Sequence, residues 1–288
     1  MPALALMVNA LVWGVSWIVF RQLVAHGWHP LWTTAIVYLC IAIFMLVGRR
    51  QRLRGFAARR GLLLLAAAAG LTNVGFNWAV TLGDVVRVVL LFYLMPLWSV
   101  LLAWLLLGER PTPAALARVA VALAGVVIIL KTPQVDWPLP NSLPDWLAVG
   151  AGFCFALTNI FLRKQGAATG EQRAFAMFVG CAVVAALAAI FGSALGRVSL
   201  PRFDGSIWIA WALLLALAFC VANICLQYAV PRLTASAVSV IMLSEVVFAS
   251  GSSVALGAAQ MGARVWLGGA LILAAALSAA LAPPPRVP

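Results

Sequence analysis

Ten apolar segments, each long enough to cross a lipid bilayer, follow one another through this chain and decide its fold class. Of the 288 residues, 65% are hydrophobic and 9% are charged, whereas a soluble domain carries about a quarter charged residues. A bilayer core of about 30 Å requires about 20 apolar residues as a helix, and backbone groups in lipid must pair within the segment. The sequence therefore predicts an all-α integral membrane protein with spans at Ala3–Phe20, Leu31–Val47, Gly61–Leu82, Val88–Leu107, Ala114–Leu130, Trp146–Leu162, Ala174–Leu195, Ile207–Val230, Ala235–Leu256 and Val265–Ala282.

The distribution of basic residues predicts the orientation. Six arginines lie in the short connection between the second and third spans, at positions 49, 50, 52, 54, 59 and 60. The positive-inside rule places this connection in the cytoplasm, and ten spans then place both chain ends there. Thirteen basic residues fall on that side and six on the other. We expect a multi-pass protein of the bacterial inner membrane. Its net charge of +12 is then explained by basic residues that fix the orientation and contact anionic lipid, and not by binding to nucleic acid.

A hidden repeat divides the chain. The proline-rich connection 132–145 separates two sets of five helices, residues 1–131 and 146–288. At an offset of 150 residues, Asn73–Val80 (NVGFNWAV) aligns with Asn223–Val230 (NICLQYAV). Because five is odd, the second copy must enter the membrane from the opposite side. Inverted-topology repeats of this kind are typical of secondary transporters with a site near the bilayer midplane, so we expect two inverted five-helix repeats joined by an external linker.

Short motifs carry a family resemblance. The motif WGxxW occupies residues 13–17, LMP occupies residues 94–96, and LGER at residues 107–110 ends the fourth span. The chain resembles the drug/metabolite transporter (DMT) superfamily, EamA type, and within it the bacterial YddG-type amino-acid exporters. The second half departs from the family pattern, with EV at residues 245–246 where the family often has Glu-Pro, and GA at residues 257–258 in place of Gly-Glu.

The resemblance implies a secondary transporter that exports small metabolites by alternating access, with neutral and aromatic amino acids as the leading substrates. Nucleosides, sugars and cationic drugs are the alternatives within the superfamily. The sequence contains no Walker A loop and no HExxH or GxSxG motif, so neither an ATP-driven pump nor a hydrolase of those types is encoded. A membrane-embedded enzyme is the alternative outside transport. The expected partners are the bilayer and a small-molecule substrate; both a monomer and a dimer are consistent with the sequence.

Polar and aromatic side chains inside the spans are the candidate substrate-binding residues, because polar groups in lipid are costly and face a cavity or a partner helix. Glu245 is the only carboxylate in a predicted span; it is either a proton site or ammonium partner, or a structural group bonded to a neighbouring helix. The intramembrane amides either bind a zwitterion or join helices, and the aromatic rings either line a cavity or pack. The candidates are Trp13, Trp17, Tyr38, Asn73, Asn77, Trp78, Phe92, Tyr93, Asn159, Asn223, Gln227, Tyr228, Met242 and Glu245.

Charged residues at span ends are candidate gates. Asp84 and Arg87 lie three residues apart at the predicted external mouth, as a local ion pair or an outer gate. Glu109 either locks the cytoplasmic side or terminates the fourth span. His26 and His29 have no further ligand near them, and the five cysteines lie inside spans without a CxxC motif, so we expect no metal site, cofactor or disulfide.

Overall fold

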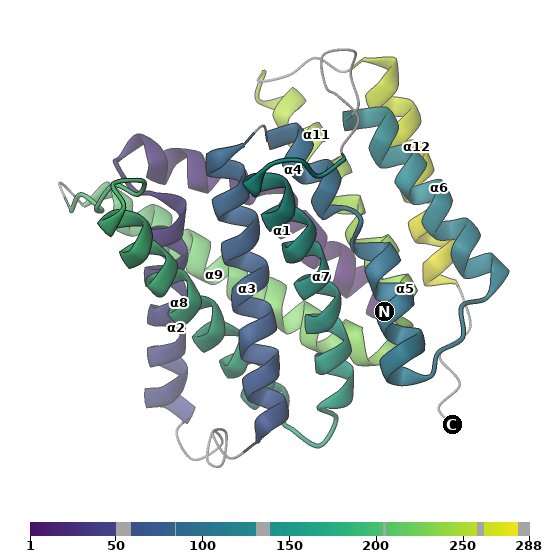
Figure 1. Cartoon of the computed structure of the whole chain (residues 1–288), viewed down its shortest axis with the longest axis horizontal. Helices are drawn as coiled ribbons and strands as arrows, with labels where there is room; N and C mark the ends of the chain where they lie inside the picture. Colours follow the sequence, from purple (N-terminus) through teal and green to yellow (C-terminus); the bar gives the residue numbers. More distant parts are fainter. Residues whose placement is uncertain (50–58, 84, 131–138, 204–205, 258–261, 282–288) are drawn as a thin grey trace.

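A computed structural model of the chain describes residues 1–49, 59–83, 85–130, 139–203, 206–257 and 262–281 (Figure 1). The regular structure in these ranges is helical. It comprises α1 (Pro2–Ala25), α2 (Pro30–Arg49), α3 (Arg60–Leu82), α4 (Val85–Phe92), α5 (Met95–Leu107), α6 (Pro113–Leu130), α7 (Leu143–Lys164), α8 (Gly170–Ala194), α9 (Ile207–Ala229), the 3₁₀ turn η1 (Val230–Arg232), α10 (Ala235–Met242), α11 (Ser244–Ala255) and α12 (Ala263–Ala280). Ten segments of this part of the chain are long and apolar enough to span a membrane, which confirms the predicted fold class.

Two of the predicted spans are not continuous helices. The span at 88–107 divides into α4 and α5, and the span at 235–256 divides into α10 and α11. Pro96 explains the first break, because proline lacks an amide hydrogen and its ring clashes with the carbonyl four residues earlier, that of Phe92. Val246 stands at the equivalent position of the second repeat, so the second break forms without a proline.

The bounds of the helices follow the offset found in the sequence. α4 at Val85–Phe92 and α10 at Ala235–Met242 lie 150 residues apart at both ends, and so do α6 at Pro113–Leu130 and α12 at Ala263–Ala280. The correspondence therefore extends from the third helix of each half through the fourth and fifth. The linker predicted at 132–145 falls largely outside the described residues, so the domain boundary there stays a prediction.

The helix ends define two faces of the bundle. We call the end that bears the connection between α2 and α3 the arginine-loop end, and the opposite end, where α7 begins, the linker end. α6 and α12 lie side by side at one edge (Figure 1), where a Cβ atom on Gly125 would lie 2.6 Å from the carbonyl oxygen of Gly268. Elsewhere α3 packs against α7 and α8, and α1 packs against α9 and α11. This arrangement surrounds the two helix breaks with the other spans.

Candidate functional site

The two helix breaks lie in the interior of the bundle. Phe92 and Tyr93 at the first break and Met242 and Leu243 at the second are at most 9% exposed, and all four belong to one cluster of buried apolar side chains. A helix break leaves backbone groups without intrahelical partners, and in transporters such interrupted helices form binding sites. The structure thus brings three predicted site residues, Phe92, Tyr93 and Met242, into one region.

Glycines allow neighbouring helices to approach both breaks closely. A Cβ atom on Gly152 of α7 would lie 2.6 Å from the carbonyl oxygen of Phe92. A Cβ atom on Gly14 of α1 would lie 2.7 Å from the carbonyl oxygen of Glu245. Each broken helix is therefore contacted at its break by the first helix of the other half of the chain.

Glu245 lies in the first turn of α11, directly after the second break. Its side chain is partly exposed, and among the described residues its carboxylate has no hydrogen-bond or ion-pair partner. The Tyr93 hydroxyl is close enough to interact with it electrostatically. The amino-terminal end of a helix favours a negative charge, so the start of α11 is a suitable position for this carboxylate.

Aromatic residues predicted for the site form a stack that crosses four helices. The ring of Trp13 stacks on Phe219 at 4.7 Å between centroids, and Phe219 stacks on Tyr38 at 5.2 Å. Tyr38 also meets Phe178 at 5.6 Å. Phe219 was not predicted, although it lies one helical turn before Asn223, which would have placed it on the same face of α9.

Trp17 lies one turn beyond Trp13 on α1. Its indole Nε1 donates a hydrogen bond of 3.0 Å to Ser252 Oγ on α11. Ser252 lies two turns after Glu245, so this bond joins α1 to the same helix that carries the carboxylate.

The amides of α3 connect helices. Tyr38 Oη lies 3.4 Å from Asn73 Oδ1, and Asn73 Nδ2 donates to the Ala69 carbonyl at 3.1 Å and to Cys181 Sγ at 3.2 Å. Asn77 Nδ2 donates to Thr34 Oγ1 of α2 at 2.9 Å. Both side chains are therefore engaged in interhelical contacts, which is the structural alternative for these amides.

The amides of α9 meet a thioether and an arginine from α8. Asn223 Nδ2 lies 3.6 Å from Met177 Sδ, and Gln227 Nε2 lies 3.4 Å from the same sulfur atom. Gln227 Oε1 accepts a hydrogen bond of 2.9 Å from Arg173 Nε. Arg173 was predicted to lie in a connection, but the capping box of Thr169 and Gln172 starts α8 at Gly170 and draws Arg173 into its first turn. The pattern T-x-x-Q at 169–172 is the sequence signal for this start.

Three other predicted site residues lie apart from these groups. Trp78 packs in a cluster with Leu31 of α2 and Ala185 of α8. Tyr228 is 42% exposed, and the Arg232 guanidinium lies 4.2 Å above its ring, so it faces away from the interior. Asn159 on α7 is 1% exposed, and neither atom of its amide has a hydrogen-bond partner among the described residues.

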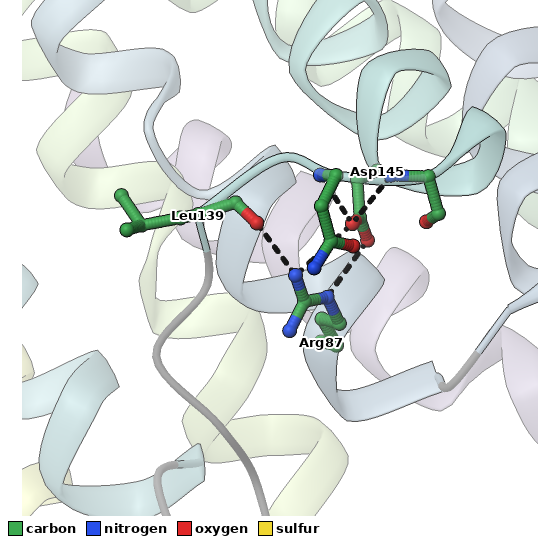
Figure 2. Close-up of polar contacts among 5 residues, drawn as sticks. Arg87, Leu139 and Asp145 are labelled. Atoms are coloured by element: carbon green, nitrogen blue, oxygen red, sulfur yellow. Dashed lines mark hydrogen bonds and ion pairs between the residues drawn. The ribbon is translucent and has the colours of Figure 1, made fainter.

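The predicted gate residue Arg87 of α4 binds Asp145 of α7. Its Nε donates to Asp145 Oδ1 at 2.9 Å, and its Nη2 donates to Asp145 Oδ2 at 3.1 Å and to the Leu139 carbonyl at 2.6 Å (Figure 2). Asp145 also accepts from the backbone amides of Asn141 and Ser142. Asp84, the residue predicted to pair with Arg87, lies outside the described residues. This network holds the start of α7 against α4.

The second predicted gate residue, Glu109, forms an ion pair with Arg163 near the end of α7. Both side chains are largely buried. The two ion pairs therefore hold α7 against the two parts of one broken helix, with α4 at the linker end and α5 at the arginine-loop end. Neither pair connects the two broken helices to each other, and a gating role for Arg87 and Glu109 stays a prediction.

Sequence comparison supports the resemblance found above. Residues 1–131 match the model of the EamA-like transporter family. The first half of this chain is EamA-like. The matched family is described as one of transporters. The EamA-like half contains α1 with Trp13 and Trp17 and the first helix break at residues 93–94.

Two relatives of known sequence or structure extend the comparison. An uncharacterized transporter, YojE of Bacillus subtilis (strain 168), is 33% identical over 135 residues, which are 42% of this chain and 44% of that protein. The match thus spans less than half of the relative's length. A solved structure described as "Crystal structure of protein" superposes with a TM-score of 0.79 at 20% identity, and the match covers 97% of this chain and 96% of that one. At this level of identity the likeness shows a shared fold across the whole chain.

Proposed function

We propose that the protein is a secondary transporter that exports small metabolites by alternating access, with neutral and aromatic amino acids as its leading substrates. The EamA-like first half and the transporter relative support the class. The finer resemblance, to YddG-type exporters, is part of this proposal. So are the location in a bacterial inner membrane and the cytoplasmic placement of both chain ends.

The unpaired carboxylate of Glu245 is the observation that supports amino acids as the substrate class. An intramembrane carboxylate without a partner is costly unless a cation or a proton neutralises it. The ammonium group of an amino acid is such a cation. Trp13 and Trp17 flank Gly14, the residue that contacts the Glu245 backbone, and indole rings attract both an ammonium group and an aromatic side chain. We assign Glu245 the ammonium group and the α1 tryptophans the side chain of the substrate.

The exposure of the second broken helix supports access from the linker end. In α10, every residue except Ser236 is at most 3% exposed. In α11, every residue from Val247 to Val254 is partly exposed. Ser239 Oγ of α10 donates to Ser99 Oγ of α5, a bond that joins the two broken helices in the arginine-loop half. We infer that this conformation is closed in the arginine-loop half, around Ser99 and Ser239.

A transporter of cationic drugs is the second candidate, because the same carboxylate and indole rings suit an aromatic cation. Uptake into liposomes that contain only this protein separates the candidates. We expect labelled phenylalanine to enter saturably and to be inhibited by other neutral amino acids. Saturable entry of labelled tetraphenylphosphonium together with no phenylalanine uptake would favour the drug transporter. Entry of a labelled nucleoside or sugar alone would move the protein to those substrate classes.

A further inference from the structure

Two amide groups near the arginine-loop end donate to a poor acceptor. The side-chain nitrogens of Asn223 and Gln227 both point to Met177 Sδ, at 3.6 and 3.4 Å. A thioether sulfur is only a weak hydrogen-bond acceptor. Both amides are more than nine-tenths buried, with exposed fractions of 7% and 8%, so water does not compensate the weak bond at the surface. Buried donors in this state cost free energy.

Arg173 fixes the direction of one of these donors. Its Nε donates to Gln227 Oε1 at 2.9 Å, and because an arginine cannot accept, the amide nitrogen of Gln227 must point away from it, toward Met177. Arg173 Nη1 donates to the carbonyls of Gln165 and Ala168. Its Nη2 has no partner among the described residues. An arginine and two amides thus present donors within one region.

Arg173 brings a positive charge to this region. The hydrogen-bond and ion-pair partners of Arg173 in the described part of the chain are carbonyl groups and an amide, without an acid. Arg232, whose Nη1 donates to the Tyr228 carbonyl, is a second basic residue at this end of α9. A positive charge such as that of Arg173 favours an anion beside it.

We propose that Arg173, Gln227 and Asn223 form a carboxylate-binding site at the arginine-loop end, which the thioether of Met177 fills in this conformation. A carboxylate offers two acceptor oxygens, enough to take bonds from both amide nitrogens and from Arg173 Nη2. Methionine is unbranched and flexible, so its side chain can leave without movement of the helix. The site is separate from Glu245, which takes the opposite charge.

The inference deepens the proposed function and rests on it for one point, that the carboxylate belongs to the transported substrate. A zwitterionic amino acid would meet Arg173 at one end of its path and Glu245 in the middle. A cationic drug has no carboxylate that the Arg173 site could bind. The same donors could also hold the phosphate of an anionic lipid, and the experiment must separate these sources.

Equilibrium binding to the purified protein tests the site without any need for transport. The protein is placed in phosphatidylcholine nanodiscs, and tryptophan fluorescence is titrated with phenylalanine, 3-phenylpropionate, phenylalaninamide and inorganic phosphate. We expect 3-phenylpropionate to bind, and Gln227→Glu to weaken its binding about 10- to 100-fold, because the new carboxylate repels it and a charge-assisted bond is lost. Met177→Ala should act in the opposite direction and strengthen binding, because it empties the site. Arg21→Gln, at an exposed position of α1, is the matched control and should change nothing.

Three results would overturn the site. The first is 3-phenylpropionate affinity that Gln227→Glu and Met177→Ala leave unchanged. The second is phosphate binding as tight as carboxylate binding, and the third is loss of 3-phenylpropionate binding when phosphatidylglycerol replaces phosphatidylcholine, which would assign the donors to lipid. Binding of 3-phenylpropionate without any amino-acid uptake would reject the proposed function and keep the site. Amino-acid uptake by the wild-type protein that Gln227→Glu leaves unchanged would support the proposed function and reject the site.

Discussion

Glu245 differs from Asp145 and Glu109 in having no counter-charge among the described residues. Asp145 and Glu109 each pair with an arginine, whereas Glu245 has no such partner among the described residues and lies beside a helix break. Its identity as a site candidate could be read from the sequence, because a lone carboxylate in an apolar run needs an explanation. Its surroundings could not, because Tyr93 and Gly14 are far away from it in the chain.

Replacement of Glu245 by glutamine should raise the apparent KM for phenylalanine about 10- to 100-fold, because it removes a charge-assisted bond to the ammonium group. Binding of 3-phenylpropionate, which has no ammonium group, should not change. Titration of both ligands against the wild-type protein and the variant measures the difference. An equal effect on both ligands would contradict the assignment. Uptake with and without a pH gradient shows whether the same residue carries protons, since the wild-type protein would then respond to the gradient and the variant would not.

Phe219 and Tyr228 occupy different surroundings on the same helix. Both lie on α9, but the structure stacks Phe219 on Trp13 and Tyr38 and exposes Tyr228 on the outside. We expect Phe219→Leu to raise the apparent KM for phenylalanine several-fold, because each stacked pair contributes about 0.5–1.5 kcal/mol beyond area burial. Tyr228→Leu is the control and should leave it unchanged. Uptake kinetics of the two variants in liposomes decide the matter, and the reverse ranking would place Tyr228 at the site.

Among the elements, the ten spans were predictable, and of the two helix breaks only the first has a signal in the sequence, Pro96. Hydropathy finds spans because lipid forces every backbone group to pair within its own segment. It does not find a break inside an apolar run such as residues 88–107, and the break near Leu243 has no proline to mark it. Contacts such as that of Arg173 with Gln227 could not be predicted from the sequence for another reason. They join residues 54 apart in the chain, and packing alone decides them.

The approach of α7 to the first break gives a prediction at the level of the element. Gly152→Ala would place a methyl group 2.6 Å from the Phe92 carbonyl oxygen, which the backbone can avoid only by moving. We expect a loss of about 1–3 kcal/mol in the free energy of unfolding, as for overpacking in a core. Gly150→Ala on the same helix meets nothing within 4 Å and serves as the control. Denaturation of both variants in detergent compares them, and equal stabilities would mean that α7 and the break are not in close contact.

For the whole molecule, the basic connection predicts the orientation. Six of the 19 basic residues lie at positions 49–60, so a cysteine introduced at position 55 should react only with reagents inside the cell. A cysteine introduced at position 136 should react only from outside. Labelling of intact cells with a membrane-impermeant maleimide, before and after lysis, measures both. Reversed labelling would invert the proposed direction of export and place the Arg173 site on the outer face.

Alternating access requires the contact between the two broken helices to open, and substrate flux through a variant that can be locked at this contact tests that requirement. The double variant Ser99→Cys/Ser239→Cys places two thiols where the hydroxyls now bond between α5 and α10. The measurement is the entry of labelled phenylalanine into liposomes that contain this variant, before oxidation, after oxidation and after reduction. We predict saturable entry that oxidation stops and reduction restores, because the disulfide keeps the arginine-loop half closed. Single-cysteine variants should not respond. No entry above that of protein-free liposomes, or entry that continues after complete oxidation, would contradict the account.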